Sequence, residues 1–173
     1  MKTITIKTLI ILFMLPFLGL SQRTGCVSGD CVDGYGTYIW ESGDKYQGIS
    51  ENNKSHIYGI YYWADGTVYK GEYDRGERHG FGTMFWNNGG SYAGEYRNGE
   101  RHGYGVQVWS NGDKYMGEYV NGARTGFAVY LWPSGAVYVG EFRNGDRHGK
   151  GTHTYPNGQV DQGIWKNNDF VGE

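Results

Sequence analysis

Short stretches of this chain alternate between aromatic or small residues and polar ones, and they are separated by pairs typical of turns. From Tyr92 to Tyr96 the order is aromatic, small, glycine, acidic, aromatic, and alternation returns from Tyr104 to Trp109. A two-residue period over so few residues predicts β-strands. Asn98-Gly99 follows the first stretch, and Asn-Gly favours a tight turn because both residues tolerate positive φ. The pattern therefore predicts a β-hairpin.

The hairpin pattern recurs every 23 residues along the chain. A fixed interval of this length is typical of repeat proteins. One column of the repeat is tyrosine: Tyr46, Tyr69, Tyr92, Tyr115 and Tyr138. Another is tryptophan: Trp40, Trp63, Trp86, Trp109 and Trp132. We predict one repeat domain over residues 22–173, with units at 23–45, 46–68, 69–91, 92–114, 115–137 and 138–160 and a partial unit at 161–173.

The fold class predicted from these units is all-β. The spacing between turns is too short for a crossover helix, so successive hairpins should extend a single antiparallel meander. With strands about 4.8 Å apart, six and a half units would make an elongated sheet about 60 Å long. The natural twist of β-strands would curve this sheet.

The first 21 residues differ from the repeats. Lys2 and Lys7 precede an apolar run from Thr8 to Leu20, which is shorter than the roughly 20 residues that a spanning helix needs. Small residues stand before Gln22, at Gly19 and Ser21. This pattern predicts a signal peptide at residues 1–21, cleaved near Ser21/Gln22, and an exported protein, secreted or periplasmic. The alternative is an N-terminal helix packed on the domain.

The two cysteines, Cys26 and Cys31, are predicted to form a disulfide. In an exported protein a pair of cysteines pairs more often than it serves redox chemistry, and the C-x4-C spacing matches no zinc motif. The bridge would hold the first unit, where Arg23 replaces the recurring tyrosine.

Composition and charge exclude some classes of function. Without Lys2 and Lys7 the chain has 14 basic against 18 acidic side chains, a net charge of −4, which argues against nucleic-acid binding. The chain contains 31 Gly and 16 Tyr. Such a composition favours a core of aromatic rings stacked against glycine backbone.

The recurring pattern YxGEYxxGxxHGxGxxxWxxGxx resembles the MORN repeat, named for a membrane occupation and recognition nexus. The resemblance extends from Arg23 to Glu173. It implies a β-hairpin repeat that serves binding or scaffolding, and for some members contact with phospholipid. The chain departs from the pattern at Arg23, Ile57, Thr125, Ala128 and Asp161.

Two columns are candidates for binding a partner. Aromatic rings should stack along one face of the sheet. Rings that remain exposed to solvent would suit a protein partner, and the alternative is that the rings form the core. This candidate face consists of Tyr69, Trp86, Tyr92, Trp109, Tyr115 and Trp132. The arginine column is a candidate for anionic headgroups, its alternative being weak surface ion pairs with neighbouring acids. It consists of Arg78, Arg101, Arg124 and Arg147.

The remaining polar columns suggest architecture. Histidines at His56, His79, His102 and His148 are about 10 Å apart, too far to share a zinc ion, so we interpret them as hydrogen-bonding to turns. No nucleophile with a base stands out, and no metal or cofactor is predicted. The sequence thus predicts a non-enzymatic module for protein–protein interaction, through the aromatic face or through terminal strands that would pair two copies. The alternative is peripheral association with anionic phospholipid.

Overall fold

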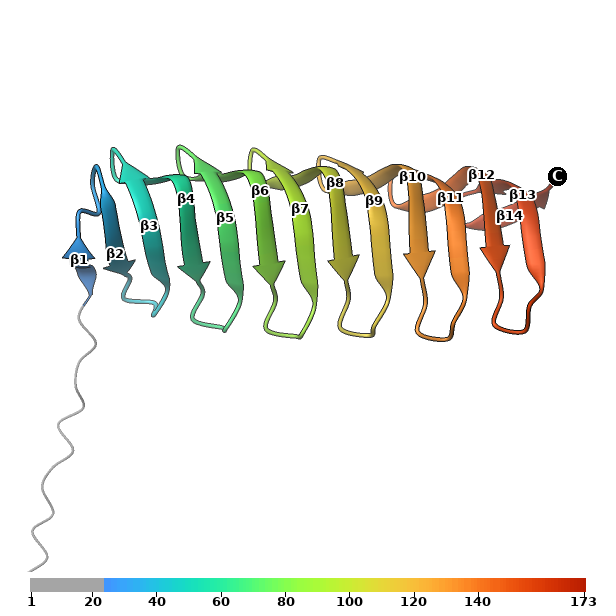
Figure 1. Cartoon of the computed structure of the whole chain (residues 1–173), viewed down its shortest axis with the longest axis horizontal. Coiled ribbons are helices and arrows are strands. Elements are labelled where there is room, and N and C mark those ends of the chain that lie inside the picture. The colour runs from blue at the N-terminus through green and yellow to red at the C-terminus, as the bar shows by residue number, and fades with distance from the viewer. Residues whose placement is uncertain (1–23) are drawn as a thin grey trace, which may run out of the picture.

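The computed structural model describes residues 24–173 and consists of β-strands alone (Figure 1). The strands are β1 (Gly25–Gly29), β2 (Tyr35–Ile39), β3 (Lys45–Glu51), β4 (Lys54–Tyr62), β5 (Val68–Asp74), β6 (Glu77–Phe85), β7 (Ser91–Arg97), β8 (Glu100–Val108), β9 (Lys114–Val120), β10 (Ala123–Leu131), β11 (Val137–Arg143), β12 (Asp146–Thr154), β13 (Val160–Lys166) and β14 (Asp169–Gly172). All 14 belong to one open sheet in chain order, each antiparallel to the next, which confirms the predicted meander. Within residues 24–173 there is no helix long and apolar enough to cross a membrane. The predicted signal peptide lies outside the described residues.

The two kinds of turn have different geometries. Asn98 and Gly99 both have positive φ, +52° and +80°, as a two-residue turn of type I′ requires. In the turn from Trp109 to Asp113 only Gly112 has positive φ, at +91°. There the Trp109 and Asp113 backbones are joined by an N–H···O bond of 2.9 Å. Asn-Gly marks both turns, as predicted, but asparagine takes the left-handed conformation only in the first.

A β-bulge interrupts the long hairpin of each complete unit. Between β7 and β8 the register shifts after the Gly94–Gly105 pair. On β8, Gly103 has φ of +55°, and the carboxylate of Glu95 accepts a 3.0 Å hydrogen bond from the Tyr104 N–H beside it. A bulge bends its strand, and Figure 1 shows the hairpin ends curling behind the sheet. In the second unit Ile57 occupies the glycine position and has φ of +57°.

One face of the sheet, here called the core face, buries the tyrosine column. Tyr92 is fully buried, with its ring edge-to-face against Tyr96 at 5.2 Å and Tyr119 at 5.3 Å. The Tyr92 ring lies over Gly105, where a β-carbon would stand only 2.5 Å from the ring atom Cε2. This contact confirms that the strand glycines make room for aromatic rings. The largest fully buried side chains all belong to this face: Tyr69, Tyr92, Tyr115, Tyr119 and Tyr138.

Candidate functional site

The predicted aromatic face divides into a buried half and an accessible half. Its tyrosines, Tyr69, Tyr92 and Tyr115, have no exposed surface. They cannot contact a partner, because neighbouring rings and the hairpin ends already cover them. For these three positions the core alternative describes the structure.

The tryptophans of that face are partly buried and pack at the edge of the same core. Trp109 stacks on Tyr130 with ring centroids 5.6 Å apart, and Trp132 lies parallel to His153 at 5.0 Å. Trp86 and Trp109 line a hollow on the core face together with Arg101. The structure therefore brings the tryptophan and arginine columns together.

Each arginine of the column binds the turn of the following hairpin. Arg101 donates from Nη2 to the Gly122 carbonyl at 3.1 Å, and its guanidinium carbon lies 5.1 Å from the centre of the Tyr119 ring. The equivalent bonds are Arg78 to Gly99 at 2.7 Å, Arg124 to Gly145 at 2.5 Å and Arg147 to Asn168 at 2.7 Å. Such bonds join each unit to the next. Burial lowers the pKa of Arg147.

The predicted ion pairs of the arginine column are absent from the described chain. Among residues 24–173, ion pairs involve His56 and Arg75 but none of the four column arginines. Aromatic rings and backbone carbonyls surround these guanidinium groups instead. The arginine side chains of the column therefore make their contacts within the protein. The spacing of the arginines in the sequence could not show this.

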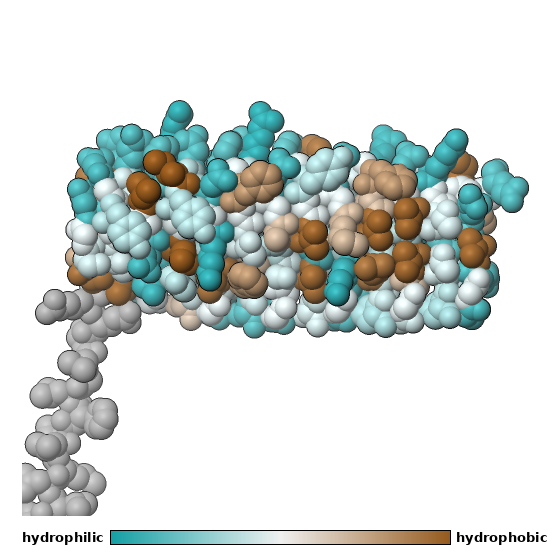
Figure 2. Space-filling view, viewed as in Figure 1, coloured by the Kyte–Doolittle hydropathy of each residue, from teal (hydrophilic) through white to brown (hydrophobic). Residues whose placement is uncertain are grey.

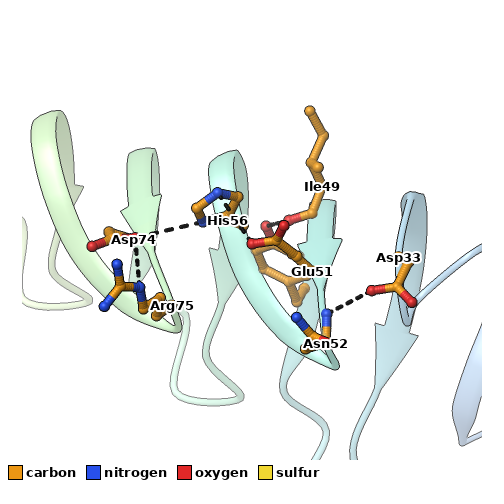
Figure 3. A network of polar contacts seen from close by, with 8 residues as sticks. Asp33, Ile49, Glu51, Asn52, His56, Asp74 and Arg75 are labelled. Atoms are coloured by element: carbon orange, nitrogen blue, oxygen red, sulfur yellow. Dashed lines mark hydrogen bonds and ion pairs between the residues drawn. The ribbon is translucent and has the colours of Figure 1, made fainter.

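The histidine column does not make the predicted bonds to turns at its buried nitrogens. Nδ1 of His56, His102 and His148 is buried without a hydrogen-bond partner in the described residues. His56 lies between Glu51 and Asp74, with nitrogen–oxygen distances of 3.5 and 3.7 Å (Figure 3). Within residues 24–173 no three His, Cys, Asp or Glu side chains are grouped to hold a metal ion.

The disulfide predicted for the first unit is present. Cys26 on β1 is bonded to Cys31, in the turn before β2, with the two Cα atoms 5.9 Å apart. The bridge closes the end of the sheet where the tyrosine column is interrupted.

The opposite face, here called the open face, carries an aromatic row that the sequence analysis missed. Four of the five rings stand between two small residues of a G-x-G-like segment, and the fifth, Tyr58, stands between Ile57 and Gly59. All five lie on the side of the strand away from the core. The members and their exposed fractions are Tyr35 61%, Tyr58 51%, Phe81 65%, Tyr104 62% and Phe127 61%. The available signal was alternation: Gly105 faces the core, so its neighbour Tyr104 must face outward.

Aliphatic side chains extend the row into an apolar surface. Val106 and Met116 are 43% and 38% exposed and line one shallow groove with Phe81, Tyr104 and Phe127. Figure 2 shows apolar side chains gathered in the middle of this face, most densely over β8 to β11. Apolar side chains gathered on one face are a feature of surfaces that bind other molecules.

A glutamate column accompanies the aromatic row. Glu118 accepts a 2.7 Å hydrogen bond from the Tyr104 hydroxyl, which raises the pKa of Tyr104. Glu72, Glu95 and Glu141 each accept one backbone N–H at the bulge, at 2.9–3.0 Å. The glutamates therefore have a local structural role and also place carboxylates beside exposed rings.

Comparison with known proteins identifies the repeat. A family model described as MORN repeat matches residues 33–45, 46–68, 69–91, 92–114, 115–137 and 138–160. A search of curated protein sequences gives no match.

Solved structures that match this chain include two CPAP domains. One is the TCP domain of dCPAP of Drosophila melanogaster in complex with a proline-rich motif of dSTIL; it is 14% identical, with 76% of this chain and 72% of that chain covered and a TM-score of 0.47. The other is the G-box domain of the microcephaly protein CPAP, 10% identical, with coverages of 76% and 75% and a TM-score of 0.41.

Proposed function

We propose that this chain, which belongs to the MORN-repeat family, is an exported, non-enzymatic module that binds a protein partner on its open face. The observation that carries the proposal is the row of five exposed aromatic rings, each more than half exposed. The core does not require these rings, because the fold buries a separate tyrosine column on the opposite face. Exposed aromatic side chains are the groups most enriched at protein interfaces.

The other recurring side chains are less suited to binding a partner, because each already makes contacts that stabilise the fold. The arginines hold the turns of neighbouring units, and the core tyrosines are covered. A contact of the arginine column with phospholipid would require guanidinium groups to exchange carbonyl acceptors for phosphate. The open face needs no such rearrangement to meet a partner.

Export is supported by two observations of different kinds. The Cys26–Cys31 bridge suits an oxidising compartment, because cytosolic disulfides are rare. The pattern of residues 1–21, outside the described residues, is that of a signal peptide. The non-enzymatic part of the proposal rests on the periodic acids, since a catalytic pair needs unique residues converging in one cleft.

The proposal is tested by affinity capture. Residues 22–173 in oxidised form are immobilised as bait, and proteins are captured from an extract of the source cells. The test variant carries Phe81→Ser, Tyr104→Ser and Phe127→Ser. The control carries Ser110→Ala and Thr154→Ala, two exposed positions outside the aromatic row. Both are first compared with the parent by circular dichroism and thermal unfolding.

A protein retained by the parent and the control, but lost with the triple variant, supports the proposal. Equal capture by all three overturns the open face as the binding surface. Cosedimentation with anionic vesicles that survives the triple substitution and disappears at high salt would favour the phospholipid alternative instead.

A further inference from the structure

The aromatic row and the glutamate column are directly paired across strands. In four consecutive units an aromatic residue stands opposite a glutamate in the register of the sheet. The pairs are Tyr58 with Glu72, Phe81 with Glu95, Tyr104 with Glu118 and Phe127 with Glu141. Residues directly opposite have Cβ atoms about 5 Å apart and share a face. Each pair therefore presents one exposed ring and one carboxylate to the same small volume of solvent.

These four carboxylates have no positive partner in the described part of the chain. None takes part in an ion pair among residues 24–173. For three of them the one bond to the protein is a backbone N–H, and Glu118 binds the Tyr104 hydroxyl. A carboxylate can accept about four hydrogen bonds, so each retains free acceptor sites.

We propose that the four aromatic–carboxylate pairs bind four cationic side chains of one extended polypeptide, an inference that rests on the proposed function of the open face. A ring attracts a cation through its quadrupole, and a carboxylate attracts it through charge. The two groups together select Lys or Arg over apolar or acidic side chains. Without Lys2 and Lys7 the net charge is −4, which favours the approach of a basic partner.

The spacing of the pairs specifies the conformation of this polypeptide. Consecutive pairs are two strands apart, a distance of about 9.6 Å at about 4.8 Å per strand. A polyproline II helix advances about 9.3 Å in one turn of three residues, so every third side chain points the same way at nearly this interval. An extended β-strand would place every third side chain on the opposite side. The match favours a polyproline II segment with Lys or Arg at every third position.

Backbone chemistry supports the same conformation. The strands beneath the four pairs are hydrogen-bonded to neighbours on both sides, so they offer no unpaired edge for an added strand. A polyproline II segment needs no backbone hydrogen bonds from its host. Recognition can then depend on side chains alone.

The row of pairs is bounded at both ends. In the first unit Tyr35 stands opposite Ile49, and in the sixth Lys150 stands opposite Ile164. Four cations at every third position span about ten residues of polyproline II. Lys70 lies on the same face, next to the first two pairs, and its charge opposes a cation there.

The test uses fluorescein-labelled synthetic peptides in fluorescence anisotropy. The main probe is Pro-Pro-Arg repeated four times. One control replaces Arg with Gln, and the other is Pro-Pro-Pro-Arg repeated four times, which keeps the charge and changes the spacing. We expect the probe to bind about tenfold more tightly than the wrongly spaced peptide, a difference of ~1.4 kcal/mol. Equal affinity for the two arginine peptides overturns the proposal.

Two variants connect binding to the pairs. Glu95→Gln with Glu118→Gln keeps oxygen acceptors but removes two charges, and should weaken the probe about tenfold. Lys70→Gln removes the opposing charge and should strengthen it several-fold. Both variants must show the parent's circular dichroism spectrum and melting temperature. Unchanged affinity in both overturns the proposal.

Other occupants give different results. If spermine displaces the probe at an equal concentration of positive charge, the surface binds cations in general. If the protein forms concentration-dependent dimers in sedimentation, and Phe81→Ser abolishes them, the face binds a second copy of the chain. Either result overturns the proposal. If a captured partner depends on the aromatic row while the arginine probe does not bind, this inference fails and the proposed function stands.

Discussion

Tyr92 and Tyr104 are the same residue type on adjacent strands of one hairpin, yet their surroundings differ completely. Tyr92 is fully buried and donates its hydroxyl to the Glu95 carbonyl at 3.0 Å, whereas Tyr104 is 62% exposed. The two faces of this single sheet are therefore not equivalent. One has become a core and the other has remained a surface.

The difference arises from the hairpin ends, which fold over only one face. Arg101 follows the turn after β7, and its guanidinium lies 5.9 Å from the Tyr92 ring centre and 5.1 Å from that of Tyr119. The bulge at Gly103 allows this bend. A second layer of protein is therefore unnecessary, since the third to sixth units each cover the core with their own turn and arginine.

Alkaline titration should have the largest effect, because it acts on the whole core face at once. Burial raises the pKa of Tyr96, Tyr119 and Tyr138 to about 12, against an ordinary value of 10.0. A raised pKa means that the unfolded chain loses its phenolic protons first, so stability is intact below pH 10 and falls as pH rises toward 12. We expect cooperative unfolding between pH 10 and 12. Circular dichroism and phenolate absorbance measure the unfolding and the ionisation.

The open-face Tyr104→Phe variant is the control for the alkaline titration. It removes an exposed phenol and should leave the unfolding midpoint unchanged. Ionisation of the core tyrosines without loss of the β-sheet spectrum would contradict the assignment of these rings to the core.

Truncating one tyrosine on each face should separate the two faces by stability. Tyr92→Ala deletes a fully buried ring and should lower the free energy of unfolding by about 3–5 kcal/mol. Tyr104→Ala removes an exposed ring and should change it by about 0.5 kcal/mol or less. Urea unfolding measures both. Similar losses at the two positions would mean that the open face also contributes a core.

The smallest effect tests the bulge that makes the faces unequal. Ile57 is held in a left-handed conformation, which costs an L-residue about 1–2 kcal/mol, and its side chain is 58% exposed. Ile57→Gly should therefore raise the free energy of unfolding by about 1 kcal/mol. Gly103→Ile should lower it, because Gly103 has the same backbone conformation and adjoins the Glu95 carboxylate. A stabilised Gly103→Ile protein would contradict the requirement for glycine at the bulge.

Local patterns in the sequence were sufficient to predict the hairpins and their arrangement. Asn98-Gly99 predicted a turn, because a turn depends on residues adjacent in sequence. The many glycines and tyrosines predicted rings stacked against glycine backbone, although not which ring covers which glycine. The side of the sheet that becomes buried depends on where the bulge directs the hairpin end. That direction follows from φ at Gly103, for which glycine is permissive rather than predictive.

The candidate site was harder to predict for the same reason. Arg101 resembled a surface cation until its acceptor, the Gly122 carbonyl of the next unit, was in place. Tyr104 and Glu95 stood in different columns of the repeat, and only the register of the sheet shows which ring stands opposite which acid. Contacts between units cannot be predicted from the sequence of a single unit.

The arginine bonds to the following turn give the array a direction. Arg147 in the sixth unit takes its acceptor from Asn168, within the partial unit of β13 and β14. That short segment thus gives the arginine of the sixth unit the same kind of carbonyl acceptor that the fourth, fifth and sixth units give to the arginine of the unit before them. Lengthening or shortening the protein in whole 23-residue steps preserves every such bond, provided that the final segment stays last. The number of aromatic–carboxylate pairs could then change by duplication alone, without redesign of either end.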